Sequence, residues 1–178
     1  MKRLRNAVRV AVLLGLAAVT LLGCALFQTG SPKDCPRVSL LNEAAKMTEY
    51  KDGPGRDLTD VLFEARVLDI KTTCSYAKNY VRVVAAIDLA AQRGPAFTVG
   101  GANVPFFVAI IDKAQNIMAK KEFQSEIRFS ATNRRAGVRE EIEQTVFLKD
   151  NESGTDYEII VGLQLNERQL QQNRGQGY

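Results

Sequence analysis

The most informative absence in this 178-residue chain is histidine, which does not occur at all. Histidine is the commonest general base of enzymes and the commonest metal ligand, so its absence excludes Ser-His-Asp and Cys-His catalytic devices. Any catalysis would have to use carboxylates or a serine paired with a lysine. We therefore expect a protein that is not an enzyme and that has no cofactor and no metal site.

Cysteine is scarce, with three residues at positions 24, 35 and 74. The spacings between them are neither that of a C-x-x-C redox motif nor that of a four-ligand zinc site. The three cysteines therefore require an explanation other than redox catalysis or zinc binding.

Most of the chain has no excess of positive or negative charge. The sequence has 24 basic and 20 acidic residues, but four of the basic residues and none of the acidic ones lie in residues 1–23. Residues 24–178 therefore carry 20 charges of each sign and a formal charge of zero. Because no basic excess remains to neutralise phosphates, nucleic acid is not an expected partner.

Residues 1–23 have the pattern of a secretory signal peptide. A basic start is followed by an apolar run over residues 10–22 and then by the small residue Gly23. This arrangement predicts a segment that is cleaved on export. The alternative is an uncleaved anchor helix over residues 10–27, which has about the length needed to cross a membrane.

The segment Leu21-Leu22-Gly23-Cys24 resembles the lipobox of bacterial lipoproteins, although Leu22 is bulkier than the usual residue at its position. The resemblance implies cleavage before Cys24, a diacylglycerol on the Cys24 thiol and acylation of the new amine, so that acyl chains anchor the protein to a membrane. Ala25 follows, and not Asp, which resembles Gram-negative lipoproteins that are sorted to the periplasmic face of the cell outer membrane.

Cys35 and Cys74 remain in the exported part. An even number of cysteines in an exported protein predicts a disulfide, and two free thiols are the alternative. Residues 24–34 would form a tether that reaches at most ~35 Å when extended. A single domain would follow over residues 35–178.

Apolar and polar residues alternate after residue 35, which is typical of strands with one buried face. The continuous apolar run 104–111 predicts a further, buried strand with Pro105 at its edge or start. Six or seven strands with regularly spaced turns predict an all-β fold, an antiparallel β-sandwich of immunoglobulin-like type. The alternating segments are residues 61–68, 81–89, 117–129, 138–148 and 157–165.

Two other segments have helical features. Residues 38–50 fit either a helix or a bent edge strand. Asn166 and Gln169 stand at the positions of a capping box, with Leu165 and Leu170 at the staple positions around it. This pattern predicts a short C-terminal helix over residues 167–173.

Four further stretches are informative after residue 34. They are Cys35-Pro36-Arg37-Val38, Gly53-Pro54-Gly55-Arg56-Asp57-Leu58-Thr59-Asp60, Val104-Pro105-Phe106-Phe107-Val108 and Glu158-Ile159-Ile160-Val161-Gly162-Leu163-Gln164-Leu165. In these stretches the chain resembles a family of small alphaproteobacterial lipoproteins to which no activity is assigned. The resemblance covers most of the part expected to be exported and implies no catalytic residues.

Two short segments contain residue types that can support catalysis or metal binding. Ser75 and Lys78 match the S-x-x-K motif of penicillin-binding proteins, but the companion motifs are absent and a turn is the expected alternative. Asp57 and Asp60 could share a calcium ion or act as an acid and a base, whereas solvation or capping of a turn is the simpler interpretation.

Two groups of charged residues are expected in or around loops. The acidic segment 150–156 departs from the EF-hand spacing and fits a hairpin loop. Arg128, Arg134, Arg135 and Arg139 could meet anionic headgroups, but neighbouring glutamates favour a solvated loop.

A glycine-rich segment with apolar residues offers a possible partner-binding loop, formed by Phe97, Val99, Gly100, Gly101 and Val104. A strand that ends in a turn is the alternative. We therefore expect a lipid-anchored cell-envelope protein that acts as a non-enzymatic interaction module for another envelope protein. The alternative function is periplasmic binding of a hydrophobic or lipid ligand between the two sheets.

Overall fold

The computed structural model describes residues 34–98 and 100–175. The predicted signal peptide, the predicted lipidation site Cys24 and the predicted tether up to residue 33 lie outside the described residues, as does Val99. Within the described ranges, no helix is both long and apolar enough to cross a membrane.

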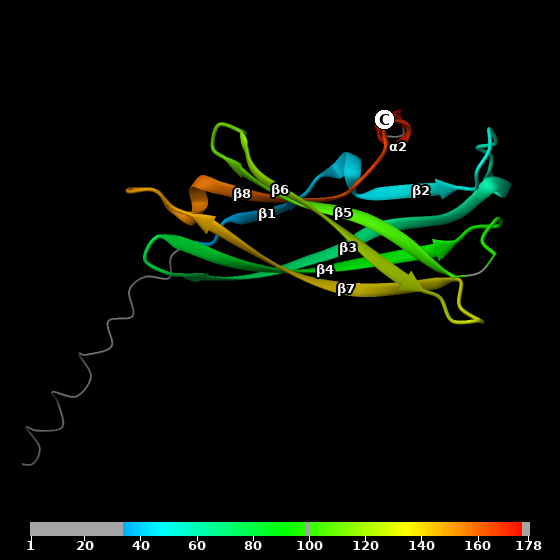
Figure 1. Cartoon of the computed structure of the whole chain (residues 1–178), viewed down its shortest axis with the longest axis horizontal. Coiled ribbons are helices and arrows are strands. Elements are labelled where there is room, and N and C mark those ends of the chain that lie inside the picture. The colour runs from blue at the N-terminus through cyan, green and yellow to red at the C-terminus, as the bar shows by residue number, and fades with distance from the viewer. Residues whose placement is uncertain (1–33, 99, 176–178) are drawn as a thin grey trace, which may run out of the picture. The chain divides into compact units, whose positions relative to one another are not determined.

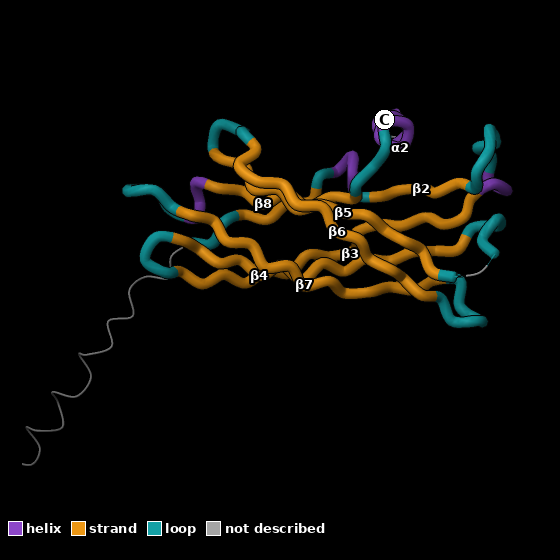
Figure 2. The backbone as a smooth tube through the Cα atoms, in the orientation of Figure 1, coloured by secondary structure: helices purple, strands orange, loops and turns teal. Residues whose placement is uncertain are grey.

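The chain folds into two four-stranded sheets that pack face to face (Figures 1 and 2). The first sheet has the order β1-β8-β5-β6, formed by Arg37–Leu40, Tyr157–Leu163, Gly101–Asp112 and Ile117–Arg128. The second has the order β2-β3-β4-β7, formed by Lys46–Tyr50, Val61–Tyr76, Tyr80–Arg93 and Arg135–Phe147. The shorter elements are the 3₁₀ turns η1 (Asn42–Ala44), η2 (Leu58–Asp60) and η3 (Gly154–Asp156) and the helix α2 (Glu167–Gly175).

The predicted β-sandwich is confirmed. Neighbouring strands are antiparallel except for β1 and β8, which run parallel. The strand order is not that of an immunoglobulin domain, in which the second and third strands lie in different sheets. Here β2, β3 and β4 are successive neighbours in one sheet.

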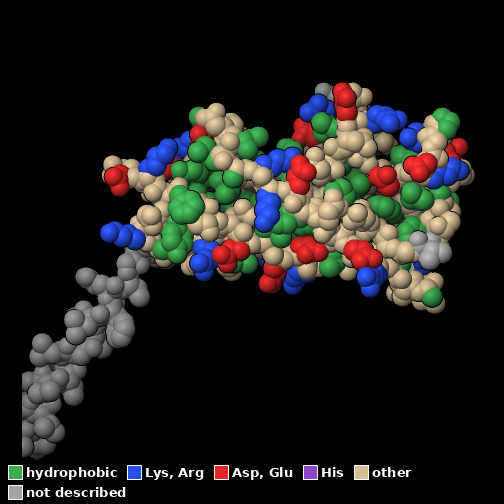
Figure 3. All heavy atoms as spheres, in the orientation of Figure 1, with side chains coloured by type: hydrophobic (Ala, Val, Ile, Leu, Met, Phe, Trp, Pro, Cys, Tyr) green, Lys and Arg blue, Asp and Glu red, His purple; other side chains and the backbone are tan. Residues whose placement is uncertain are grey.

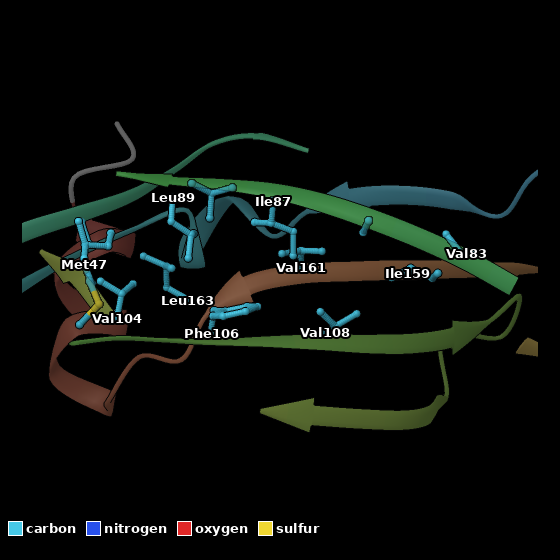
Figure 4. Packing of buried hydrophobic residues seen from close by; sticks show 14 of the residues in the cluster. Met47, Val83, Ile87, Leu89, Val104, Phe106, Val108, Ile159, Val161 and Leu163 are labelled. Atoms are coloured by element: carbon cyan, nitrogen blue, oxygen red, sulfur yellow. The ribbon is translucent and has the colours of Figure 1, made fainter. Parts of the chain in front are cut away.

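The core fills the space between the sheets with side chains from the inward rows of the strands. Ile87 and Leu89 of β4 face Phe106 of β5 and Leu163 of β8, and all four are at most 1 % exposed (Figure 4). Burial of one such side chain stabilises the fold by about 1.5–3 kcal/mol. Alternation predicted the inward row of β4 correctly, and the continuous apolar run 104–111 predicted that β5 is a buried strand.

Pro105 lies inside β5, a central strand, and not at an edge or start as predicted. The last residue of β8, Leu163, pairs with Phe106, so β8 has ended where Pro105 lies. The Pro105 carbonyl oxygen still accepts a hydrogen bond from the Gln164 amide, at 2.8 Å. Proline has no amide hydrogen, but at this position no residue of β8 would accept a hydrogen bond from it.

Residues 38–50 form two strands in different sheets, which resolves the choice between helix and bent strand. β1 pairs with β8, the 3₁₀ turn η1 follows, and β2 pairs with β3 in the other sheet. Ala44 of η1 is buried, and a Cβ at Gly162 would come within 2.9 Å of its side chain. The glycine lets η1 lie close against β8 as the chain changes sheets.

The predicted disulfide between Cys35 and Cys74 is confirmed. It lies at one end of the sandwich, where the Tyr76 hydroxyl donates to the Asp34 carbonyl and accepts from the Gly154 amide. The described chain thus enters at the end that holds the β3–β4 turn. The loop residues 51–60, 94–98 and 129–134 lie at the opposite end (Figure 1).

The predicted capping box of the C-terminal helix is confirmed. The Gln169 amide donates to the Asn166 side chain and the Asn166 amide donates to the Gln169 side chain, both at 3.0 Å. Side chains of α2 also donate to carbonyl oxygens of β2, from Gln169 to Thr48 and from Asn173 to Lys46. The helix therefore covers the edge of β2.

Candidate interaction surface

Asp57 and Asp60 hold a turn together. Asp57 accepts hydrogen bonds from Thr59, while the buried Asp60 accepts from the Asp57 amide and pairs with Lys51 at 2.6 Å. The bonds from the Thr59 side chain and amide lower the pKa of the Asp57 carboxyl. Capping, the simpler of the two sequence interpretations, accounts for both residues.

The S-x-x-K segment and the acidic segment 150–156 are also explained by their roles in the fold. Ser75 lies near the exposed end of β3 and Lys78 in the following turn, without the helix that the S-x-x-K motif requires. The acidic segment contains η3, and its Asp156 pairs with Lys113 at 2.7 Å. No group of three or more acidic or cysteine side chains within the described ranges is arranged to hold a metal ion.

The four candidate arginines do not form a common patch of unpaired charge. Arg128 pairs with Glu126 and Arg139 with Asp88. Arg134 donates to the Arg93 carbonyl and Arg135 to the Gln92 side chain, which are neutral groups and leave both positive charges in place. Half of the charge of the four arginines is therefore balanced by carboxylates of the same chain.

The predicted loop of Phe97, Gly100, Gly101 and Val104 is only partly a loop. Gly101 begins β5, and Val104 is a fully buried core residue with 0 % exposure, so Val104 cannot contact a partner. The Phe97 ring packs edge-on against Phe129 at 5.1 Å. Gly100, with a φ of +111°, is the turn residue that leads into the strand.

Arg93 fixes this loop to the loop 129–134. Its guanidinium lies 5.8 Å from the Phe97 ring centre and 5.5 Å from that of Phe129, and it donates to the Asn133 carbonyl. Phe97 is therefore half-buried in a cation–π cluster, and only part of its ring faces solvent.

A more open surface lies on the outer face of the second sheet, beside these loops. A hollow of about 480 Å³ has Leu68 at one end, and a floor that includes Ala90 and Gly137. An adjoining hollow of about 240 Å³ reaches Leu58 and Pro95. We call these two hollows together the outer groove; they share Glu64 and Gln92.

Two leucines mark the ends of the outer groove. Leu58 is 81 % exposed and Leu68 is 61 % exposed, whereas most of the large apolar side chains on the strands face the core. Leu68 lies at a β-bulge, because Val67 pairs with Leu89 and Asp69 with Asp88, which leaves Leu68 without an opposite residue. Bulges commonly redirect a side chain in this way.

Small residues make the floor of the outer groove. Ala90 of β4 is paired with Gly137 of β7, and a Cβ at Gly137 would lie 2.9 Å from the Leu89 carbonyl oxygen. Charged side chains of Glu64, Arg66 and Arg135 form the rim. An apolar floor with exposed leucines and a charged rim is the arrangement found at protein interfaces.

Sequence reasoning did not identify the outer groove. In the alternating segment 61–68, Leu68 stands in the same row as Glu64 and Arg66, opposite the row of Val61 and Phe63. A leucine in the outward row was the available signal. The pairing of Ala90 with Gly137 joins residues that are far apart in the sequence, so the small-residue floor could not be recognised from the sequence.

Comparison with protein-family models, curated proteins and solved structures finds no match to this chain.

Proposed function

We propose that this protein is a lipid-anchored module of the cell envelope that binds another envelope protein through the outer groove. The observation that carries the proposal is the pair of exposed leucines, Leu58 and Leu68, at the two ends of a hollow with a small-residue floor. A partner that covers such side chains removes apolar surface from water, which favours association.

The anchor in this proposal is the diacylglycerol on Cys24, at the periplasmic face of the outer membrane. The lipobox and Ala25 support it. Asp34 enters the domain beside the Cys35–Cys74 disulfide, at the end opposite the loops next to the groove. The groove therefore lies away from the end of the domain at which a tether would join it.

The proposal does not extend to a ligand between the sheets, which was the alternative. Val104, Phe106 and Val108 of β5 pack directly against the opposite sheet and are at most 1 % exposed. A ligand site of the usual kind needs a cavity of several hundred cubic ångströms. The hollows described above lie outside the sandwich.

The test of partner binding uses a photo-reactive amino acid in place of Leu68 in cells that express the full chain. We expect a cross-link to one protein, and we expect Leu58→Ser to reduce its yield about tenfold. Thr73, on the outer face of the same sheet near the tether end, is the matched control position. Equal cross-linking from both positions would rule out the groove as the binding site.

The anchor is tested separately with labelled palmitate. The wild-type chain should incorporate label and partition with membranes, and Cys24→Ser should lose both properties. Full membrane partition of the Cys24→Ser chain would contradict lipid anchoring, and it would leave the groove experiment unaffected.

A further inference from the structure

Within residues 34–98 and 100–175, β6 pairs only with β5 and is the last strand of the first sheet. Among these residues its other edge has no partner strand. Its first half stands clear of the opposite sheet, with Ile117 66 % and Met118 52 % exposed. Figure 3 shows hydrophobic side chains gathered over the start of β6 and the end of β7.

Such an edge can extend the sheet by pairing with another strand. Proteins often protect an edge by placing a charge on its inward face, and Lys121 has this position, 5.1 Å from the Phe123 ring centre. The sequence of β6 shows what kind of strand would fit beside it.

The charges along β6 are complementary to those of a second, antiparallel copy. With a twofold axis at Phe123, Lys120 lies opposite Glu126 of the second copy, and the same pair forms twice. Opposite charges directly across antiparallel strands stabilise their pairing. The remaining opposite pairs are Glu122 with Gln124, Lys121 with Ser125, Ala119 with Ile127 and Met118 with Arg128.

Neighbouring registers are less favourable. An axis at Glu122 places that residue opposite itself, and an axis at Gln124 places Glu122 opposite Glu126. Like charges directly opposite each other destabilise a pair of strands. An axis at Ser125 avoids such repulsion but pairs only residues 122–128, whereas the axis at Phe123 uses almost the whole strand.

The same register brings inward side chains of the two edges together. The two Phe123 rings meet at the axis. Lys121 comes opposite Ser125, whose hydroxyl donates to Glu140 at 2.6 Å. The ammonium group of Lys121 then faces a carboxylate of the other copy.

We propose that two copies of this chain form a twofold dimer by antiparallel pairing of their β6 edges, with Phe123 at the axis. The pairing joins two first sheets into one continuous sheet of eight strands. It uses the sheet that does not contain the outer groove, so the dimer forms whether or not the groove binds a partner.

A charge exchange in the full-length, detergent-solubilised chain tests the register by analytical ultracentrifugation. Lys120→Glu and Glu126→Lys should each weaken the dimer about tenfold, because each places two pairs of like charges opposite each other. The chain with both substitutions should regain the wild-type dimer. Lys71→Glu, an exposed lysine on the other sheet, is the control and should leave the dimer unchanged.

A second experiment places a cysteine at the axis. Phe123→Cys should form a covalent dimer on mild oxidation, because residues opposite each other in antiparallel strands have Cβ atoms ~4.5–5.5 Å apart. Leu68→Cys, on the other sheet, should stay monomeric under the same conditions. A wild-type chain that is monomeric at high micromolar concentration would overturn the proposal, and so would a dimer that neither single charge substitution weakens.

Discussion

Ser125 of β6 donates a hydrogen bond to the carboxylate of Glu140 of β7, with 2.6 Å between the two oxygens. The two residues belong to different sheets, and Figure 1 shows that β6 and β7 cross at this side of the sandwich. Ser125 is 1 % exposed, so its hydroxyl has little access to water as an alternative partner. β6 and β7 are the last strands of their sheets within the described residues. The bond therefore links the two sheets at their edges.

Ser125→Ala should lower the free energy of unfolding by about 1–2 kcal/mol, because it removes a hydrogen bond to a charged group and leaves the Glu140 carboxylate with fewer partners. Urea denaturation measures the effect. Ser75→Ala, at the exposed end of β3, is the matched control and should change stability little. Equal midpoints for Ser125→Ala and the control would show that the bond does not stabilise the fold.

Replacing both Cys35 and Cys74 by serine should lower the free energy of unfolding by about 4 kcal/mol, on the model in which a cross-link restricts the unfolded chain. The bond closes a loop with a sequence separation of 39 residues. Denaturation of the wild-type domain with and without reductant should give the same difference as the double substitution. A loss below about 1 kcal/mol would contradict this model for the present bond.

Gln169→Ala should lower the free energy of unfolding by about 1–2 kcal/mol. The substitution removes half of the capping box and the bonds from Gln169 to the Thr48 carbonyl and to Glu49. Gln171→Ala, two residues along the same helix and exposed, is the control. Hydrogen exchange at the β2 amides should accelerate only in the Gln169 variant, and unchanged exchange would mean that α2 does not protect this edge through Gln169.

Glu49→Gln should stabilise the protein at neutral pH. Burial raises the pKa of the Glu49 carboxyl, although the bond from Gln169 and the charge of Arg56 act in the opposite direction. Folding thus favours the protonated form, so the contribution of Glu49 to stability is greatest at low pH and is lost as the pH rises through the raised pKa. The gain in the variant should be largest near pH 7 and disappear near pH 4.

Glu152→Gln should change stability at neutral pH in the opposite direction to Glu49→Gln. The hydrogen bond from the Tyr157 hydroxyl, at 2.6 Å, is the main cause of the lowered pKa of Glu152. This carboxylate stabilises the fold above its ordinary pKa, and the contribution is lost as the pH falls through the lowered value. The variant should be less stable than wild type at neutral pH, with the difference vanishing in acid. If the free energy of unfolding of both variants, relative to wild type, changed with pH in the same direction, the opposite pKa shifts of Glu49 and Glu152 would be contradicted.

The parts of the fold that the sequence predicts well are those set by local pattern. Alternation in residues 81–89 placed Ile87 and Leu89 in the core because a strand side chain can only point to one face or the other. The spacing of Asn166 and Gln169 predicted the start of α2 because a capping box is formed within four residues. The disulfide followed from the even number of cysteines in the part of the chain that is predicted to be exported.

The parts that were not predicted depend on residues far apart in the sequence. β1 is a strand because it pairs with β8, and nothing in residues 37–40 identifies that partner. Val104 stands both in the candidate loop after Gly100 and Gly101 and at the start of the apolar run 104–111. The structure selects the strand, because β5 extends back to Gly101 by pairing with β6. The outer groove required both a bulge at Leu68 and the pairing of Ala90 with Gly137.

The place of the Cys35–Cys74 bond determines how a mechanical load would travel through the molecule. A pull on Asp34 reaches Cys35 first and passes through the covalent bridge to Cys74 in β3, which pairs with β4 from Phe63 to Tyr76. The four-residue ladder of β1 is bypassed. With the bridge reduced, the same pull would act on β1 directly and separate it from β8. The oxidised domain should therefore withstand a larger force at Asp34 than the reduced domain.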